Sequence, residues 1–269
     1  MKIIFWNTQR SADLAHYHAN WPGGNFLLAC EILIDSQLKV SRQSPSKNRA
    51  QLGYRIIAPF TGLYLDEWEV NDFDELTGFP IWISGGNSFK KQSKRQVAQV
   101  LPTGSTRLDI NLFIFHANSS DRAPTIMSWV ICDLAINLND FVLLGDFNCE
   151  PLELMKALVY VYKVTQDSNL KDSLKGVRVT FAGHTHNAKT AANKTLDYMV
   201  SKGVNLLLKV HNNVNDSDHY PIEASDPGFL VFNAVYRTMI TSTYFNWSWS
   251  GVWNRVYNSG GCEVWEFEG

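Results

Sequence analysis

The stretch VLLGDFNCEP, residues 142–151, ends a run of apolar residues with an acidic and an amide side chain. Four apolar residues in a row are typical of a strand covered on both faces, and Gly145 allows a close backbone approach at its end. Asp146 and Asn148 are two residues apart, so strand periodicity turns both side chains to one side while Phe147 points to the core. A carboxylate beside a neutral amide suits a metal ion and a phosphate.

Polar residues interrupt or end other apolar runs in the same way. Asn7 follows KIIFW, Glu31 interrupts FLLACEIL, His116 ends LFIFHA, Asp197 lies in TLDYMV, and Asp218 and His219 stand in NDSDHYPI. Taken singly, an Asp or His at a strand end is usually a turn former or a satisfied polar group. Their order along the chain says more than any one of them.

The order of these residues and motifs resembles that of the endonuclease/exonuclease/phosphatase superfamily, whose type member is deoxyribonuclease I. The order is strand-end Asn, strand Glu, strand-end His, GDFN, LDY and SDH. The similarity spans residues 1–224. The segments are most similar to the catalytic B subunits of the cytolethal distending toxins at FIFHANSS, GDFN followed by EP, LDYMVSKG and SDHYPI. The resemblance implies a four-layer α/β sandwich with its site at one edge, where a divalent metal serves to cut phosphodiester or phosphomonoester bonds.

The resemblance also implies a metal site. Magnesium is the expected cofactor, with Mn²⁺ or Ca²⁺ as substitutes. Glu31 is the first choice of ligand, and Asn7 and Asp218 match the other metal-proximal positions of the family. A carboxylate-based site of this kind suits Mg²⁺, which binds through few protein oxygens and keeps several waters.

Five residues match the catalytic positions of the family. Asp146 and Asn148 would hold the attacking water and a phosphate oxygen, while His116 would bind the phosphate from the other side. His219 would pair with Asp197, whose carboxylate fixes the tautomer of the imidazole and raises its basicity. Both Asp146 and the Asp197–His219 pair are candidates for the general base.

A cationic cluster, KKQSKR, follows the strand-like run FPIWIS. The formal charge of the whole chain is −2, so a polyanion has to be held locally and not by a general positive field. We expect the cluster to contact the phosphate backbone of a nucleic acid, with a merely solvated charged surface as the alternative. The predicted substrate-binding residues are Lys90, Lys91, Lys94 and Arg95.

Strand-like runs outnumber helical ones along the chain. Helical spacing predicts one helix over 123–138, and a second over 151–162 with Pro151 in its first turn. This excess of strands over a β-α-β alternation points to two packed, mostly antiparallel sheets with helices outside. The fold expected is therefore an α/β (α+β) class, four-layer α/β/β/α sandwich.

The composition changes after the turn signal SDPG. Residues 225–269 are rich in Trp, Tyr and Phe, and segments such as YFNWSWSGVW alternate bulky and small polar residues, as half-buried strands do. We expect a catalytic domain over 1–224 and an aromatic-rich β extension over 225–269. The extension is interpreted as strands that close a sheet edge or form a contact with another subunit or copy, with a stacking platform for bases or sugars as the alternative.

Four cysteines without CxxC spacing predict free thiols. No apolar run is long enough to predict a membrane-spanning helix. The chain begins MKIIFWNTQ, which predicts a strand and not a signal peptide, so we expect either a cytoplasmic protein or the mature form of a secreted one.

Two histidine pairs, in HYH at 16–18 and HTH at 184–186, have the i, i+2 spacing that could begin a zinc site. Further ligands at a fitting spacing are not evident for either pair. We interpret these histidines as solvent-exposed loop residues.

The sequence therefore predicts a Mg²⁺-dependent phosphodiesterase, with DNA as the expected substrate. The alternative within the enzymes is a phosphatase acting on phosphoinositides or other phosphomonoesters, because the same metal and histidine chemistry serves both. The alternative outside the enzymes is a binding module that keeps the fold and has lost turnover.

Overall fold

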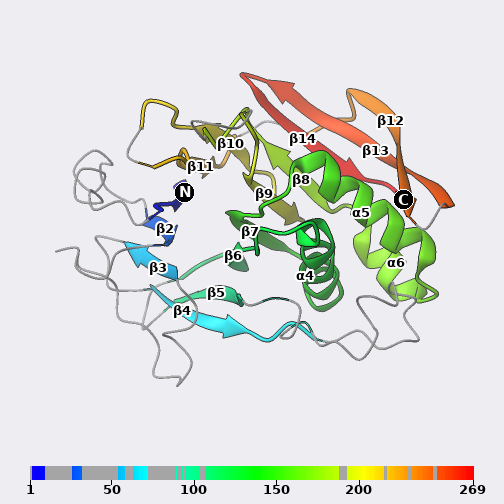
Figure 1. The fold of residues 1–269 in the computed structure, drawn as a ribbon, viewed down its shortest axis with the longest axis horizontal. Helices are drawn as coiled ribbons and strands as arrows, with labels where there is room; N and C mark the ends of the chain where they lie inside the picture. The colour runs from blue at the N-terminus through cyan, green and yellow to red at the C-terminus, as the bar shows by residue number, and fades with distance from the viewer. Residues whose placement is uncertain are drawn as a thin grey trace.

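Two β-sheets pack face to face in the computed structural model, with helices beside the larger sheet (Figure 1). The structure describes residues 2–9, 26–31, 54–57, 63–71, 89, 93, 95–102, 107–187, 193–214, 217–228, 232–244 and 247–269.

The smaller sheet is built from five described strands. In spatial order they are β10 (Leu207–Val210), β11 (Ile222–Ser225), β1 (Lys2–Asn7), β2 (Phe26–Cys30) and β3 (Tyr54–Ile57). β1 and β2 are parallel, and the other neighbouring strands are antiparallel.

The larger sheet contains nine described strands. In spatial order they are β12 (Tyr236–Tyr244), β13 (Trp247–Ser259), β14 (Cys262–Phe267), β8 (Arg178–Phe181), β9 (Asp197–Lys202), β7 (Phe141–Asp146), β6 (Leu112–His116), β5 (Val97–Pro102) and β4 (Leu63–Trp68). Only β6 and β7 run parallel among these neighbours, so the sheet is mostly antiparallel.

Three described helices lie beside the larger sheet: α4 (Ala123–Asn137), α5 (Pro151–Val164) and α6 (Ser168–Leu174). α5 packs on β8, β12 and β13, and α4 packs against α5 and α6 (Figure 1). α5 begins with a capping box, in which Glu150 and Glu153 satisfy backbone N–H groups of the first turn. Asp167 caps α6 by accepting from two backbone N–H groups.

The core fills the space between the two sheets, where β1 packs over β7 and β11 over β9, and continues between the larger sheet and the helices. Ile3 and Phe5 of β1 belong to this core, and the alternate residues Ile4 and Trp6 are buried as well. β1 is therefore covered on both faces, which explains why its sequence is apolar without alternation.

Gly145 is needed where β7 lies beside β6. Its register partner is Phe115, and a Cβ atom at Gly145 would overlap the carbonyl oxygen of Phe115. The close backbone approach expected from the sequence is thus present, and it sits one residue before Asp146.

The predicted α/β sandwich of two mostly antiparallel sheets is confirmed, and the helices expected over 123–138 and 151–162 are α4 and α5. The four cysteines are free and buried. β4 and α6 were not expected from the sequence. The strand-like run at 79–84 lies outside the described residues.

The C-terminal residues form β12, β13 and β14, and β14 pairs with β8, so these strands extend the larger sheet. The division of the chain into a catalytic domain over 1–224 and an extension over 225–269 stays a prediction. No helix in the described part of the chain combines the length and the apolar character needed to cross a membrane.

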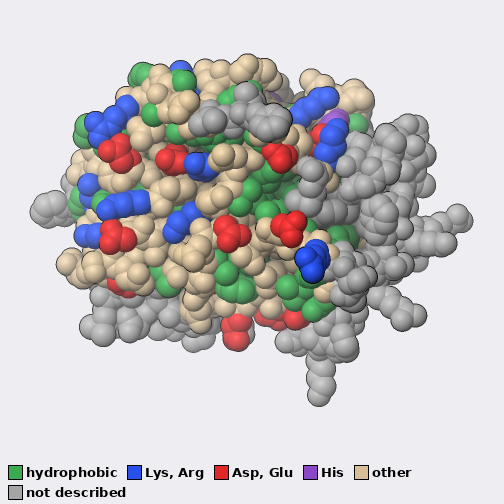
Figure 2. All heavy atoms as spheres, turned by 180° about the vertical axis from the view of Figure 1, so that it is seen from behind, with side chains coloured by type: hydrophobic (Ala, Val, Ile, Leu, Met, Phe, Trp, Pro, Cys, Tyr) green, Lys and Arg blue, Asp and Glu red, His purple; other side chains and the backbone are tan. Residues whose placement is uncertain are grey.

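Acidic and basic side chains are interspersed on the face that Figure 2 shows. On the C-terminal strands and β8, three arginines form ion pairs with glutamates: Arg178 with Glu266, Arg237 with Glu268, and Arg255 with Glu263. Each of these arginines therefore has an acidic partner. The described C-terminal strands do not present a row of unpaired positive charge.

Candidate active site

Strand register brings the predicted polar residues to one edge of the sandwich. His116 ends β6 and is the register partner of Asp146, the last residue of the parallel strand β7. β9 runs antiparallel to β7 and begins with Asp197, which also pairs with Asp146. On the smaller sheet, Asn7 ends β1 beside Cys30, and Glu31 follows at once. Five separate segments therefore end at one place.

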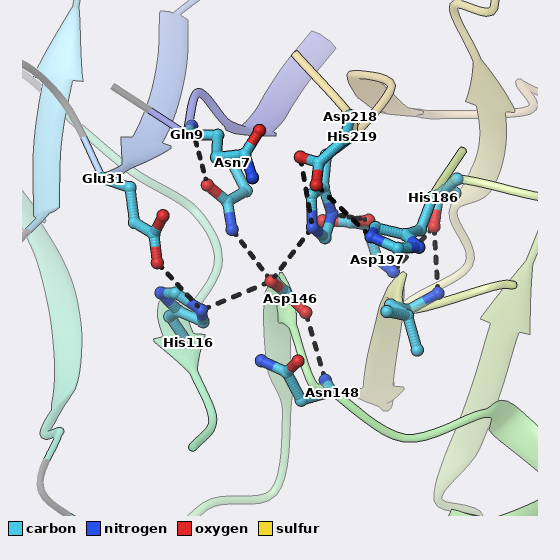
Figure 3. Close-up of polar contacts among 12 residues, drawn as sticks. Asn7, Gln9, Glu31, His116, Asp146, Asn148, His186, Asp197, Asp218 and His219 are labelled. Carbon is cyan, nitrogen blue, oxygen red and sulfur yellow. Dashed lines mark hydrogen bonds and ion pairs between the residues drawn. The ribbon is translucent and has the colours of Figure 1, made fainter. Parts of the chain in front are cut away.

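Asp146 is the centre of the cluster (Figure 3). Its Oδ2 atom accepts a hydrogen bond of 2.9 Å from Nδ2 of Asn7 and lies 3.3 Å from Nε2 of His116 and 3.7 Å from Nε2 of His219. Its other oxygen accepts from the backbone N–H of Asn148 at 3.1 Å. Burial alone would raise the pKa of Asp146, but His116, His219 and Asn7 outweigh it and lower the pKa to about 2. The carboxylate is thus ionised and held in one orientation.

His219 and Asp197 form a buried pair on the other side of Asp146. Nδ1 of His219 lies 2.7 Å from Oδ2 of Asp197. Burial by itself disfavours a charged ring, but the carboxylates of Asp197, Asp146 and Asp218 raise the pKa of His219 to about 10. The charged form is therefore the stable one in the metal-free protein, and only Nε2 is left to face a substrate.

The backbone around this pair is tied down. The indole N–H of Trp6 donates to the backbone carbonyl of His219 at 2.8 Å, and Oγ1 of Thr185 accepts from the backbone N–H of Asp197 at 2.9 Å. Oδ1 of Asp197 is buried and has no hydrogen-bond partner among the described residues. An unpaired buried carboxylate oxygen costs stability, which is a common sign of a functional position.

Glu31 sits on the rim, just after β2. Its φ of 55° is left-handed, and Thr8 fixes its backbone by donating from Oγ1 to its carbonyl oxygen at 2.8 Å. The Glu31 side chain is 32% exposed, with Oε1 3.5 Å from the Arg95 guanidinium and 3.6 Å from Nε2 of His116. Strain in the backbone and a half-exposed carboxylate together indicate a position shaped for a ligand.

Asn148 follows Asp146 in a left-handed conformation, with φ at 50°. Its Nδ2 donates to the backbone carbonyl of Ala117 at 2.9 Å, and Phe147 between them is fully buried against Tyr198. The alternation expected for residues 146–148 is therefore present. Asn148 itself is half-buried and lies at the surface of the cluster.

Of the predicted substrate-binding residues, Arg95 lies at the site. Its guanidinium donates to the carbonyl of Ala117 at 2.9 Å and is 34% exposed beside Glu31. The other three, Lys90, Lys91 and Lys94, lie outside the described residues.

His186 is a member of the cluster that sequence reasoning missed. Its Nε2 lies 3.4 Å from Oδ2 of Asp218, and its ring packs edge-on against that of His219 with centroids 4.7 Å apart. Burial lowers the pKa of His186, and the nearby His219 adds to this, so the ring is neutral near pH 7. The expectation of an exposed loop histidine is wrong here, although it holds for His184. HYH at 16–18 lies outside the described residues.

The residues present include oxygen donors for a hard divalent cation. Glu31 and Asp218 lie on opposite sides of Asp146, with Asn7 between them (Figure 3). Their carboxylate and amide oxygens are the donors that Mg²⁺ prefers. Two tighter groups also offer three ligand atoms within 4.8 Å of one another: Asp146, Asp197 and His219, and His186, Asp218 and His219.

Neither a protein-family model nor a curated protein sequence matches the chain. Among solved structures, the endonuclease domain of TRAS1, a telomere-specific non-LTR retrotransposon, is similar with a TM-score of 0.50 and 12% identity over 85% of this chain and 99% of that one. An endonuclease/exonuclease/phosphatase from Beutenbergia cavernae gives a TM-score of 0.46 and 11% identity over 97% and 79% of the two chains. The catalytic domain of Xenopus laevis APE2 gives 0.42 and 13% over 84% and 91%.

These likenesses concern the fold. The chain has the sandwich of the TRAS1 endonuclease domain, so the expected deoxyribonuclease I-like fold is confirmed. The finer resemblance to cytolethal distending toxin B subunits stays a prediction.

Proposed function

We propose that this chain is a divalent-metal-dependent hydrolase of phosphoesters and that its substrate is the phosphodiester backbone of DNA. One observation carries the proposal: Oδ2 of Asp146 is surrounded by Nδ2 of Asn7, Nε2 of His116 and Nε2 of His219. An ionised carboxylate held among an amide and two imidazoles where strand ends of both sheets meet is suited to a water and a phosphate.

A bound divalent cation would neutralise charge on the phosphate oxygens, and Glu31, Asn7 and Asp218 would hold it. Glu31 is suited to this because it is half-exposed and its backbone is fixed by Thr8. Mg²⁺ is the ion that such a set of oxygen donors favours, with Mn²⁺ or Ca²⁺ as substitutes.

The protein groups divide the remaining work. Asp146 would orient the attacking water by accepting its proton in a hydrogen bond, with Asn148 beside it. Nε2 of His219 would donate to a phosphate oxygen, because Asp197 occupies the other ring nitrogen and three carboxylates favour the cation. His116 would donate to the phosphate from the opposite side of Asp146.

DNA is proposed as the substrate because Arg95 brings a cation to the rim and the sequence places Lys90, Lys91 and Lys94 just before it. A local cationic edge can hold a polyanion even though the whole chain has a net charge of −2. The TRAS1 domain, whose fold is similar, is an endonuclease, which agrees with this choice.

Nicking of supercoiled plasmid tests the proposal. The wild-type chain should relax the plasmid in Mg²⁺ and not in EDTA, and Asp146→Asn should lower the rate at least about 100-fold. Asp133→Asn is the matched control, because Asp133 is also a buried aspartate but lies in α4, where it accepts from Trp68 and Asn71.

Parallel assays with a phosphoinositide and a simple phosphomonoester separate the alternatives. Hydrolysis of these and not of plasmid would replace the nuclease with a phosphatase. No turnover of any ester by a folded, metal-loaded chain would leave only a binding module and overturn the proposal.

A further inference from the structure

We propose that His186, Asp218 and His219 form a zinc-binding site through which Zn²⁺ inhibits the chain. Binding of zinc stands on the geometry of these residues alone, whereas inhibition rests on the proposed function. The sequence offered HTH at 184–186 as the start of a zinc site but without further ligands, and the metal ligands expected from it did not include His186.

One pair of donor atoms has the separation that zinc requires, and the others lie within 4.8 Å of one another. A tetrahedral site with bonds of about 2.0–2.2 Å places neighbouring donor atoms about 3.3–3.6 Å apart. Nε2 of His186 lies 3.4 Å from Oδ2 of Asp218, and Nε2 of His219 lies 3.9 Å from Oδ1 of the same carboxylate. One ligand atom from each of the three residues lies within 4.8 Å of the other two.

The two segments that carry these ligands are already held together. His186 and His219 form an antiparallel bridge, the backbone N–H of Asn187 donates to the carbonyl of Asp218 at 2.8 Å, and that of Tyr220 donates to Thr185 at 2.7 Å. His186 also exchanges two backbone hydrogen bonds with Lys194. A site whose backbone is fixed before binding loses little entropy when the metal arrives.

The surroundings of the ligands favour zinc over magnesium. Two imidazole nitrogens and one carboxylate are a typical zinc set with a fourth position open, while Mg²⁺ prefers oxygen donors. Nδ1 of His219 is bound to Asp197 at 2.7 Å, which is the carboxylate–histidine arrangement that orients an imidazole toward a metal. Asp146 adds further negative charge, with Oδ2 3.7 Å from Nε2 of His219.

The position of His186 has a cost that a ligand role would account for. Nδ1 of its ring is buried and has no hydrogen-bond partner among the described residues. The free energy lost by leaving this nitrogen unpaired is not recovered by a strong contact elsewhere, because Nε2 is 3.4 Å from its carboxylate. Coordination of a metal at Nε2 would supply that compensation.

Zinc at this site would block the proposed chemistry directly. A metal on Nε2 of His219 takes the place of the proton of the charged ring, which is released to solvent on binding. The metal then occupies the one ring nitrogen that is left to meet a phosphate, and it takes Asp218 away from the magnesium site. Zinc should therefore inhibit by competing with the phosphate for His219 and with Mg²⁺ for Asp218. The chain should stay folded while it is inhibited.

Calorimetric titration of the chelator-treated chain with Zn²⁺ tests the site without reference to activity. The wild type should bind zinc, and Co²⁺ in its place should give the intense visible absorption of a tetrahedral ion. Loss of a residue that only orients a metal ligand lowers metal affinity about 10–100-fold. His186→Gln and Asp218→Asn each remove a ligand and should weaken zinc binding by more than this. His211→Gln is the control, because His211 also contacts a carboxylate, Glu223, but on the smaller sheet.

Plasmid nicking in constant Mg²⁺ with rising Zn²⁺ tests the inhibition. The zinc concentration that halves each variant's own rate should rise for His186→Gln by the factor seen in calorimetry and stay unchanged for His211→Gln. Equal zinc affinity in wild type and a folded His186→Gln chain, or turnover supported by zinc at full occupancy, overturns the inference. Zinc binding lost in His186→Gln, in a chain that hydrolyses no ester, would keep the site and sink the proposed function alone.

Discussion

Nδ1 of His219 lies 2.7 Å from Oδ2 of Asp197, and both side chains are buried. The two residues are 22 positions apart, Asp197 at the start of β9 and His219 in the segment before β11, so only the folded chain brings them together. This hydrogen bond fixes which ring nitrogen is free. The orientation of Nε2 toward Asp146 is its direct consequence, and the proposed chemistry depends on it.

Loss of the Asp197 carboxylate should therefore act through His219. We expect Asp197→Asn and His219→Gln each to lower turnover at least about 100-fold, and the double variant to lose little more than the worse single one, because the two residues act as a unit. Single-turnover rates on plasmid would measure this. Losses that multiply in the double variant would show that the pair does not work as one.

The stability of the metal-free chain should depend on pH through the same pair. The pKa of His219 is raised from 6.5 to about 10 in the folded state, so the folded chain holds this proton more tightly than the unfolded chain. The stabilisation is complete below about pH 6.5 and is lost as the pH rises through about 10. Urea unfolding in EDTA at pH 7 and pH 10 should therefore show a larger drop for wild type than for His219→Gln. An equal drop in both would mean that the ring is neutral at pH 7.

The strand-end residues could be predicted because their signal is local. An apolar run that stops at Asp146 or His116 fixes a strand end, and parallel neighbours such as β6 and β7 place those ends together. The order of the motifs then indicated the fold. Which atoms meet, and that Asp146 is the centre, depended on register and on side-chain directions that no local pattern encodes.

His186 and β4 were missed for physical reasons that differ. His186 reaches the site through a single bridge to His219 between two irregular segments, and such a long-range pairing leaves no periodic trace in the sequence. β4 carries Asp66 and Glu67, because it is the edge strand of the larger sheet, and charges there break the apolar pattern that marks a strand.

Replacement of Gly145 should damage the fold before it damages the chemistry. A Cβ at this position would overlap the carbonyl oxygen of Phe115, which is backbone of the neighbouring strand and cannot rotate away. We expect Gly145→Ala to cost at least the about 1–3 kcal/mol typical of overpacking. Gly228→Ala is the comparison without a clash, because nothing lies within 4 Å there and its cost is only the backbone strain of a side chain at a φ of 73°. If the two variants had the same unfolding midpoint, this account of Gly145 would be contradicted.

The C-terminal strands should stabilise the larger sheet and not bind substrate. Trp253 of β13 is fully buried and packs on Phe267 with ring centroids 4.9 Å apart, whereas Met239 of β12 is exposed. Trp253→Ala should cost about 3–5 kcal/mol of unfolding free energy, and Met239→Ala should cost little. A stacking platform would instead need exposed rings. If the C-terminal strands formed one, replacing the exposed Tyr236 would weaken substrate binding.

Nucleic-acid affinity of Tyr236→Ala decides between these two roles of the C-terminal strands. The ring of Tyr236 lies under the guanidinium of Arg255, 5.2 Å from its centroid, and edge-on to Trp265, so it already has partners within the sheet. We therefore expect unchanged affinity for a DNA duplex and for a single strand at fixed salt concentration. A loss of about 1–3 kcal/mol in single-strand binding, the size of one base stacked on an aromatic ring, would establish the platform instead.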